Sequence, residues 1–130
     1  MGQTAAANDG TTVLVVEDEV PIGEMIGEAL MSHGFQVYVV SSAAGALRYL
    51  LSGSPADVLF TDINLAGHID GTILAERARE VRPDLPIVFA SGRANLFEHL
   101  RTIPGAACLA KPYSPAQACS VVEGLVATAY

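Results

Sequence analysis

Short apolar segments alternate along the chain with longer segments in which apolar residues recur every three or four positions. The short segments have the continuous, β-branched character of strands that are buried on both faces of a sheet. They occupy residues 12–16, 35–40, 58–61, 87–90 and 106–110. The longer segments have the period of amphipathic helices. Because β–α–β crossovers are right-handed, five such units predict an α/β domain with a parallel sheet between two helix layers.

Glycine, proline and capping residues mark the ends of the five predicted helices. These helices run from Pro21 to a stop at Gly34, over 43–51, from Asp70-Gly71 to Val81, over 94–100, and onward from a capping box at Ser114 and Gln117. The fourth is the shortest. Its Leu96, Phe97 and Leu100 fit either an exposed partner surface or ordinary core packing.

Chain length, net charge and hydropathy indicate a small single-domain protein and disfavour nucleic-acid-binding and membrane proteins. The 130 residues suit one domain, with the small and polar residues 1–11 as a flexible tail and residues 12–130 as the folded part. Seven basic against fourteen acidic residues give a net charge of −7, which disfavours binding to nucleic acid or anionic membranes. No apolar run is long enough to span a bilayer, and the chain opens without a signal-peptide pattern. We therefore expect a cytoplasmic protein.

Polar residues follow the predicted strands at the end where chemistry is expected. The first strand is followed by Glu17 and Asp18, the third by Asp62, the fourth by Ser91 and the fifth by Lys111. The carboxyl ends of parallel strands share one edge of the sheet, where ligands bind. Only neighbouring central strands can bring these side chains together, which favours placing the first strand between the second and the third.

Three carboxylates at one place repel one another, so a cation is needed to compensate them. Mg²⁺ fits oxygen ligands from Glu17, Asp18, Asp62 and the backbone carbonyl of Asn64. With the ammonium of Lys111 and the hydroxyl of Ser91, such a pocket suits a phosphoryl group carried by Asp62. Any one of these residues alone also fits a cap or a salt bridge without chemistry. Their occurrence on separate strands favours the phosphoryl site.

The sequence resembles the receiver domain of bacterial two-component response regulators over residues 12–130. The fragments that carry the resemblance are Val15-Val16-Glu17-Asp18-Glu19, Thr61-Asp62-Ile63, Asp70-Gly71, Ala90-Ser91-Gly92 and Lys111-Pro112-Tyr113. It implies a flavodoxin-like, doubly wound sheet of five parallel strands in the order 2-1-3-4-5, with five helices. It also implies a cis peptide bond between Lys111 and Pro112.

The same resemblance implies a signalling switch of the single-domain, chemotaxis-regulator type rather than an enzyme. Asp62 would accept phosphate, in the presence of Mg²⁺, from a sensor histidine kinase or a histidine phosphotransfer protein. Glu17 and Asp18 would hold the metal, Ser91 would be the switch hydroxyl and Lys111 would contact the phosphoryl group. If the chain is complete, its output would be contacts with another protein.

Two departures from the family pattern concern output and lifetime. Cys108 stands where the fifth strand usually carries an aromatic switch residue, so the coupling of phosphorylation to output is left open. The loop at residues 66–69 has no Pro and is one residue longer than usual, with His68 expected to be solvated. Asn64 and Arg93 flank the expected entry of water, so we expect both to affect the lifetime of the phosphorylated state.

Three other functions remain as alternatives. A Mg²⁺-dependent phosphatase of the haloacid dehalogenase type would need a second Asp where Asn64 stands. A flavodoxin would need a phosphate-binding loop where Glu17, Asp18 and Glu19 would repel phosphate. A receiver-like scaffold would work without any phosphorylation.

Overall fold

The computed structural model describes residues 10–67 and 69–129. Its elements are β1 (Thr12–Val16), α1 (Val20–Ser32), β2 (Gln36–Val40), α2 (Ala43–Leu51), β3 (Val58–Asp62), α3 (Gly71–Val81), β4 (Ile87–Ser91), a 3₁₀ turn at Ala94–Leu96, α4 (Phe97–Leu100), β5 (Ala106–Ala110) and α5 (Pro115–Ala129). Strands and helices alternate as the hydrophobic pattern predicts. None of the described helices is both long and apolar enough to cross a membrane.

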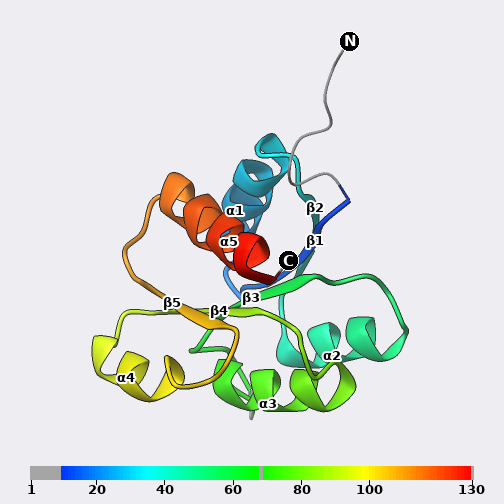
Figure 1. Ribbon diagram of the computed structural model, residues 1–130, viewed down its shortest axis with the longest axis vertical. Coiled ribbons are helices and arrows are strands. Elements are labelled where there is room, and N and C mark those ends of the chain that lie inside the picture. The colour runs from blue at the N-terminus through cyan, green and yellow to red at the C-terminus, as the bar shows by residue number, and fades with distance from the viewer. Residues whose placement is uncertain (1–9, 68, 130) are drawn as a thin grey trace.

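The five strands form one parallel sheet in the order β2-β1-β3-β4-β5. Helices α1 and α5 cover one face, and α2, α3 and α4 cover the other (Figure 1). This is the flavodoxin-like, doubly wound arrangement, with the chain reversing direction across the sheet at β1 and β3. The predicted fold class and strand order are confirmed.

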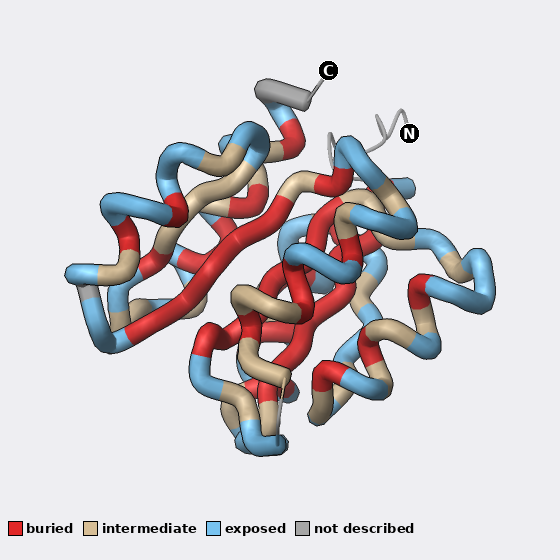
Figure 2. The backbone as a smooth tube through the Cα atoms, turned by 90° about the horizontal axis from the view of Figure 1, so that it is seen from below, coloured by how far each residue is buried: buried red, intermediate tan, exposed pale blue. Residues whose placement is uncertain are grey.

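The core consists of two layers, one on each face of the sheet. Side chains of β1, β3 and β4 alternate between the layers, so every residue of these three strands is buried (Figure 2). Val15 and Phe60 pack under α1 and α5, whereas Leu14, Leu59 and Phe89 pack against the other helices. Burial on both faces explains why these strands are continuously apolar. The edge strand β2 is only partly covered.

Local capping explains the helix boundaries. The Asp70 carboxylate accepts hydrogen bonds from the backbone N–H groups of Thr72 and Ile73 at 2.9 and 3.0 Å and so begins α3. The predicted capping box of α5 is present, with Ser114 N donating to Gln117 Oε1 at 2.8 Å and Gln117 N donating to Ser114 Oγ at 3.1 Å.

The fourth helix differs most from its prediction. Residues 94–100 do not form one helix but a 3₁₀ turn followed by a four-residue α4. Phe97 and Leu100 are each only 3% exposed and belong to the core, so the alternative of an exposed partner surface is wrong for these two residues. Burying two large side chains within one helical turn brings this segment close to the sheet.

The N-terminal boundary stays a prediction. Residues 1–9 of the predicted tail lie outside the described residues. Thr11, the last residue of that range, is buried, and its carbonyl accepts a hydrogen bond from Gln36 N at 2.9 Å.

Candidate functional site

Side-chain alternation in β1 and β3 places two carboxylates next to each other. Glu17 follows Val13 and Val15, and Asp62 follows Val58 and Phe60, on the sheet face covered by α1 and α5. The strands are neighbours, with Val16 opposite Thr61 in the register. Glu17 is 2% exposed and Asp62 is 4% exposed, so both carboxyl groups are withdrawn from bulk water.

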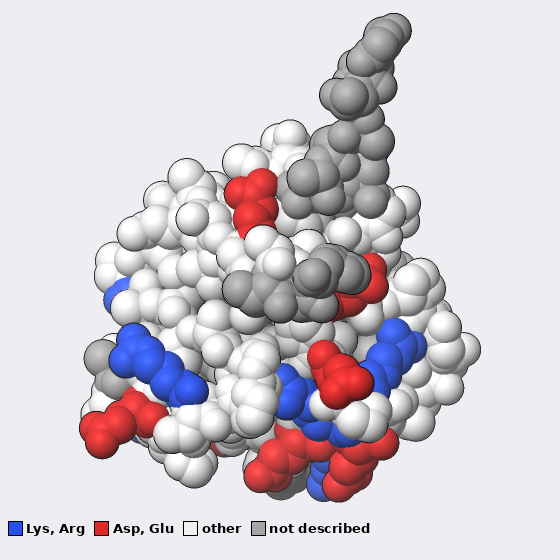
Figure 3. Space-filling view, viewed as in Figure 1, with Lys and Arg blue, Asp and Glu red and all other residues white. Residues whose placement is uncertain are grey.

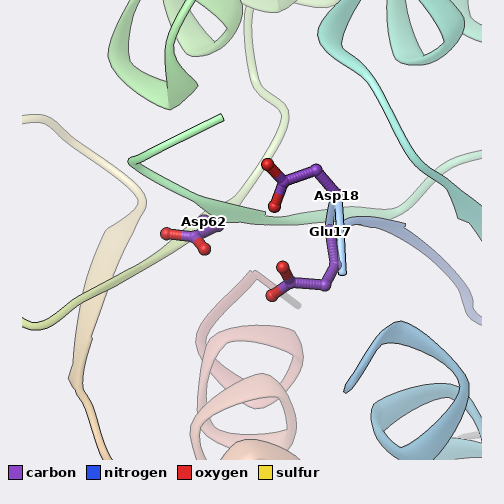
Figure 4. A group of neighbouring side chains, drawn as sticks. All are labelled: Glu17, Asp18 and Asp62. Carbon is purple, nitrogen blue, oxygen red and sulfur yellow. The ribbon is translucent and has the colours of Figure 1, made fainter. Parts of the chain in front are cut away.

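Asp18 completes a cluster of three acids. Glu17, Asp18 and Asp62 each offer a carboxylate oxygen, and these oxygens all lie within 4.8 Å of one another. Figure 4 shows the carboxyl groups of Glu17 and Asp18 extending toward the side of Asp62, at the ends of β1 and β3. Three hard oxygen donors at this spacing match the ligand preference of Mg²⁺, which also keeps several water ligands. The residues present therefore fit a magnesium ion.

Burial raises the pKa of Glu17 to about 7, and the nearby charge of Asp62 acts in the same direction. The hydrogen bond from Glu19 N to Glu17 Oε2, at 3.1 Å, opposes this rise but does not cancel it. Without a cation, the cluster therefore holds a proton near neutral pH that a carboxylate in water would have lost.

Lys111 supplies the nearest positive charge. Its Nζ donates a hydrogen bond to Asp62 Oδ2 at 2.6 Å, across 49 residues of sequence. Burial alone would lower the pKa of Lys111, but the hydrogen bond and charge of Asp62 outweigh it and raise the pKa. The other oxygen of Asp62, Oδ1, accepts a hydrogen bond from Asn64 N at 3.1 Å.

The peptide bond between Lys111 and Pro112 is cis, as the resemblance implies.

Ser91 lies at the end of β4 but its side chain follows those of Ile87 and Phe89, on the opposite face from Glu17 and Asp62. It is fully buried. Its Oγ accepts a hydrogen bond from Arg93 N at 3.0 Å, and within the described residues no hydrogen bond joins it to Asp62. The structure thus brings Asp62 together with Lys111 and the acids, and keeps Ser91 adjacent but unconnected to them.

Two loops meet beside these residues. Arg93 Nη2 donates to Asn64 Oδ1 at 3.2 Å, so the loop after β4 is tied to the loop after β3. Both side chains are exposed. His68, in the loop after Asp62, lies outside the described residues.

Gly71, which the sequence predicts to open a helix, also supports the Asp62 loop. Its N–H donates to Ile63 O at 2.8 Å. A Cβ at this position would lie 2.2 Å from the backbone oxygen of Asp62 and 2.8 Å from Ile63 Cα. The sequence signal was the pair Asp70-Gly71 a few residues after a strand-end Asp, where backbone must approach backbone.

The raised pKa of Glu17 leads to a pH prediction for the metal-free protein. An unfolded Glu ionises near pH 4.5, whereas folded Glu17 ionises near pH 7. Between these values the folded state binds more protons, so its free energy of unfolding falls as the pH rises, and the loss is complete above about pH 7. Glu17→Gln has no such proton, so its stability relative to the parent should increase from pH 5 to 7 and then level off.

Urea unfolding of both proteins in a chelating buffer at about pH 5, 6, 7 and 8 measures this difference. Parallel stability curves for parent and Glu17→Gln would contradict the prediction.

Residues 13–123 match the family model of the response regulator receiver domain. Among curated relatives, the sensor histidine kinase RcsC of Salmonella typhimurium is 30% identical over 112 residues, which is 85% of this chain and 12% of that protein. The sensor kinase CckA of Brucella abortus is 31% identical over 119 residues, covering 88% of this chain and 12% of the kinase. The chain therefore spans about an eighth of the length of these two relatives.

Solved structures of similar size resemble most of the chain. A response regulator receiver protein from Sinorhizobium medicae is 35% identical with a TM-score of 0.84, over 92% of this chain and 97% of that one. The chemotaxis response regulator CheY4 of Vibrio cholerae shares the fold with a TM-score of 0.78 at 19% identity, over 88% and 98% of the two chains. With its sheet order and the family match over residues 13–123, the chain belongs to the response regulator receiver domain family, the phosphoacceptor signalling domains of two-component systems.

Proposed function

We propose that Asp62 is the phosphoacceptor of this receiver domain and that it takes its phosphoryl group from a phosphohistidine of a sensor kinase or a histidine phosphotransfer protein. The observation that carries this proposal is the setting of the Asp62 carboxylate. It is buried, it accepts a 2.6 Å hydrogen bond from Lys111, and it belongs to a cluster of three acids. A nucleophilic carboxylate needs this combination of a fixed orientation and nearby positive charge.

In the transfer, an oxygen of Asp62 forms a bond to phosphorus while the bond from phosphorus to the imidazole nitrogen breaks. The electron pair of the broken bond goes to the imidazole, which takes up a proton, and Asp62 becomes an acyl phosphate. Lys111 stabilises charge on the phosphoryl oxygens. Bound Mg²⁺, held by Glu17, Asp18, Asp62 and the Asn64 backbone carbonyl, would neutralise more of that charge. The domain thereby assists its own phosphorylation without turning over a substrate.

Ser91 is our candidate for the switch. In the structure its hydroxyl accepts from Arg93 N, and donation to a phosphoryl oxygen would require it to rotate toward Asp62. Such a rotation would disturb β4 at Phe89, which lies opposite Cys108 in the β4–β5 register. A cavity of about 570 Å³ beside Phe89 and Leu100 leaves room for this region to repack. To move the equilibrium between the present arrangement and the repacked one from 99:1 to 1:99, phosphorylation must stabilise the repacked arrangement by about 5.5 kcal/mol relative to the present one.

The proposed partners are proteins. Acidic residues outnumber basic ones fourteen to seven, and on the face in Figure 3 basic groups lie beside acidic ones rather than in one patch. This distribution supports neither nucleic acid nor an anionic membrane as a partner. The free thiols of Cys108 and Cys119 suit the reducing cytoplasm. A second protein that reads the phosphorylated form of residues 12–130 would provide the output.

The test uses acetyl phosphate as a small phosphoryl donor and intact-mass spectrometry as the readout. We expect the mass of one phosphoryl group to be gained with Mg²⁺ and not with a chelator. A phosphorylation-independent scaffold would gain no mass under either condition. A phosphatase would instead release phosphate from small phosphomonoesters with steady-state turnover, which the Asn at position 64 argues against.

The link between Arg93 and Asn64 predicts an effect on the lifetime of the acyl phosphate. Arg93→Ala removes the 3.2 Å hydrogen bond that ties the two loops together beside Asp62. A net hydrogen-bond contribution of about 0.5–1.5 kcal/mol corresponds to roughly two- to tenfold in rate. We expect dephosphorylation to accelerate by about this factor because water gains access to the acyl phosphate.

The lifetime can be followed by intact mass after the donor is removed. Arg77→Ala, which removes an exposed Arg of α3, is the matched control and should leave the lifetime unchanged. Equal lifetimes for Arg93→Ala and the parent would contradict the prediction.

A further inference from the structure

The hydroxyl of Tyr113 is an unusual group in this molecule. Among the buried side-chain oxygen and nitrogen atoms of the described residues, it is the one without a hydrogen-bond partner. The other two tyrosines in the described part of the chain differ: Tyr49 donates to Pro55 O at 2.6 Å, and Tyr38 is 52% exposed. Buried polar groups in folded proteins are nearly always paired, so this hydroxyl calls for an explanation.

The ring of Tyr113 lies on the same face of the sheet as the Glu17 and Asp62 side chains. It packs edge-on against Phe60, with ring centroids 6.1 Å apart and an interplanar angle of 67°. Phe60 and Asp62 are two residues apart in β3, so their side chains lie on the same face of the sheet. Tyr113 also follows Lys111 by two residues, across the cis bond to Pro112. These contacts place the ring on the side of α1 and α5, within electrostatic reach of Asp62.

The hydroxyl is within electrostatic reach of two of the acids. Burial raises the pKa of Tyr113, and the charges of Glu17 and Asp62 raise it further. The hydroxyl therefore stays neutral, and its oxygen can accept a hydrogen bond. Among the described residues none forms a hydrogen bond with this hydroxyl, although the charges of Glu17 and Asp62 reach it.

We propose that Tyr113 is a positioning residue of the metal site, whose hydroxyl oxygen accepts a hydrogen bond from a water ligand of the Mg²⁺ held by Glu17, Asp18 and Asp62. Mg²⁺ keeps several water ligands, and each is a strong hydrogen-bond donor that needs an acceptor in a buried site. Side chains that do not touch the metal but hydrogen-bond to its ligands fix the orientation of those ligands. The inference rests on the proposed function, because it assumes that the acidic cluster binds Mg²⁺.

The proposal predicts opposite effects of one substitution on two quantities. Tyr113→Phe keeps the ring that packs on Phe60 and removes only the hydroxyl. In a chelating buffer the variant should unfold at an equal or higher urea concentration than the parent, because a buried unpaired hydroxyl is gone. Its dissociation constant for Mg²⁺, measured by titration calorimetry, should rise by about tenfold. Tyr38→Phe, at an exposed tyrosine of β2, is the matched control and should change neither quantity.

Each other result would overturn the proposal. An unchanged Mg²⁺ dissociation constant in Tyr113→Phe would show that the hydroxyl does not support the metal. A loss of stability in the chelating buffer would show that the hydroxyl is already satisfied without the metal. Failure of the parent to bind Mg²⁺ would overturn the proposed function as well, whereas binding by the parent with equal binding by the variant would overturn this inference alone.

Discussion

Asp62→Asn is expected to abolish the Mg²⁺-dependent gain of a phosphoryl group from acetyl phosphate. Asn has the shape of Asp and can still accept a hydrogen bond from Lys111, so the packing around residue 62 is kept. It lacks the anionic oxygen that attacks phosphorus, and it offers the metal a neutral ligand in place of a carboxylate. Loss of a nucleophile typically slows a reaction by several orders of magnitude, so the mass gain should disappear.

The control for this prediction is Asp84→Asn, which makes the same chemical change at an exposed loop position after α3. It should be labelled like the parent. Thermal unfolding of both variants shows whether the fold is kept, and beryllium fluoride offers a second readout because it mimics a phosphoryl group on a carboxylate. Labelling of Asp62→Asn at the parent's rate would mean that another residue accepts the phosphoryl group.

The second large effect is expected from Gly71→Ala. The new Cβ would lie 2.2 Å from the backbone oxygen of Asp62 and 2.8 Å from Ile63 Cα, and neither backbone atom can rotate away. The loop after Asp62 must move, and the hydrogen bond from Gly71 N to Ile63 O must lengthen or break. Overpacking of this kind destabilises a protein by about 3 kcal/mol, which corresponds to a fall in melting temperature on the order of 10 °C.

Gly124→Ala provides the contrast, because a Cβ at this exposed position of α5 meets no atom within 4 Å. Ala is the better helix former, so this variant should be as stable as the parent or about 0.5–1 kcal/mol more stable. Gly71→Ala should also bind Mg²⁺ more weakly, since Asp62 is displaced. Equal melting temperatures for the two variants would contradict the close approach of Gly71 to the Asp62 loop.

The sheet was predictable because each element carries a strong local signal. The strands β1, β3 and β4 are buried on both faces and are therefore largely apolar, and they end at or just before Glu17, Asp62 and Ser91. The fourth helix was predicted less well. Its two core residues, Phe97 and Leu100, are buried by contacts with the sheet, and a seven-residue segment is too short for periodicity to show this.

The candidate site also has features that the sequence predicted and features that it did not. Strand ends alone predicted that Glu17, Asp62 and Lys111 would share one edge, and the structure places them together. The orientation of Ser91 away from Asp62, its bond to Arg93 and the approach of Gly71 were not predicted. Each of these three features depends on contacts between loops that follow different strands. Local sequence patterns do not predict such contacts.

By itself, the sequence determined the alternation of strands and helices, the identity of the residues at the strand ends and the family to which the pattern belongs. These depend on local periodicity and on the rule that parallel strands end at a common edge. Only the tertiary structure decided which atoms touch: the 2.6 Å bond from Lys111 to Asp62, the raised pKa of buried Glu17 and the unpaired hydroxyl of Tyr113. Distances, burial and pairing arise between segments far apart in sequence, and they exist only once the sheet has brought those segments together.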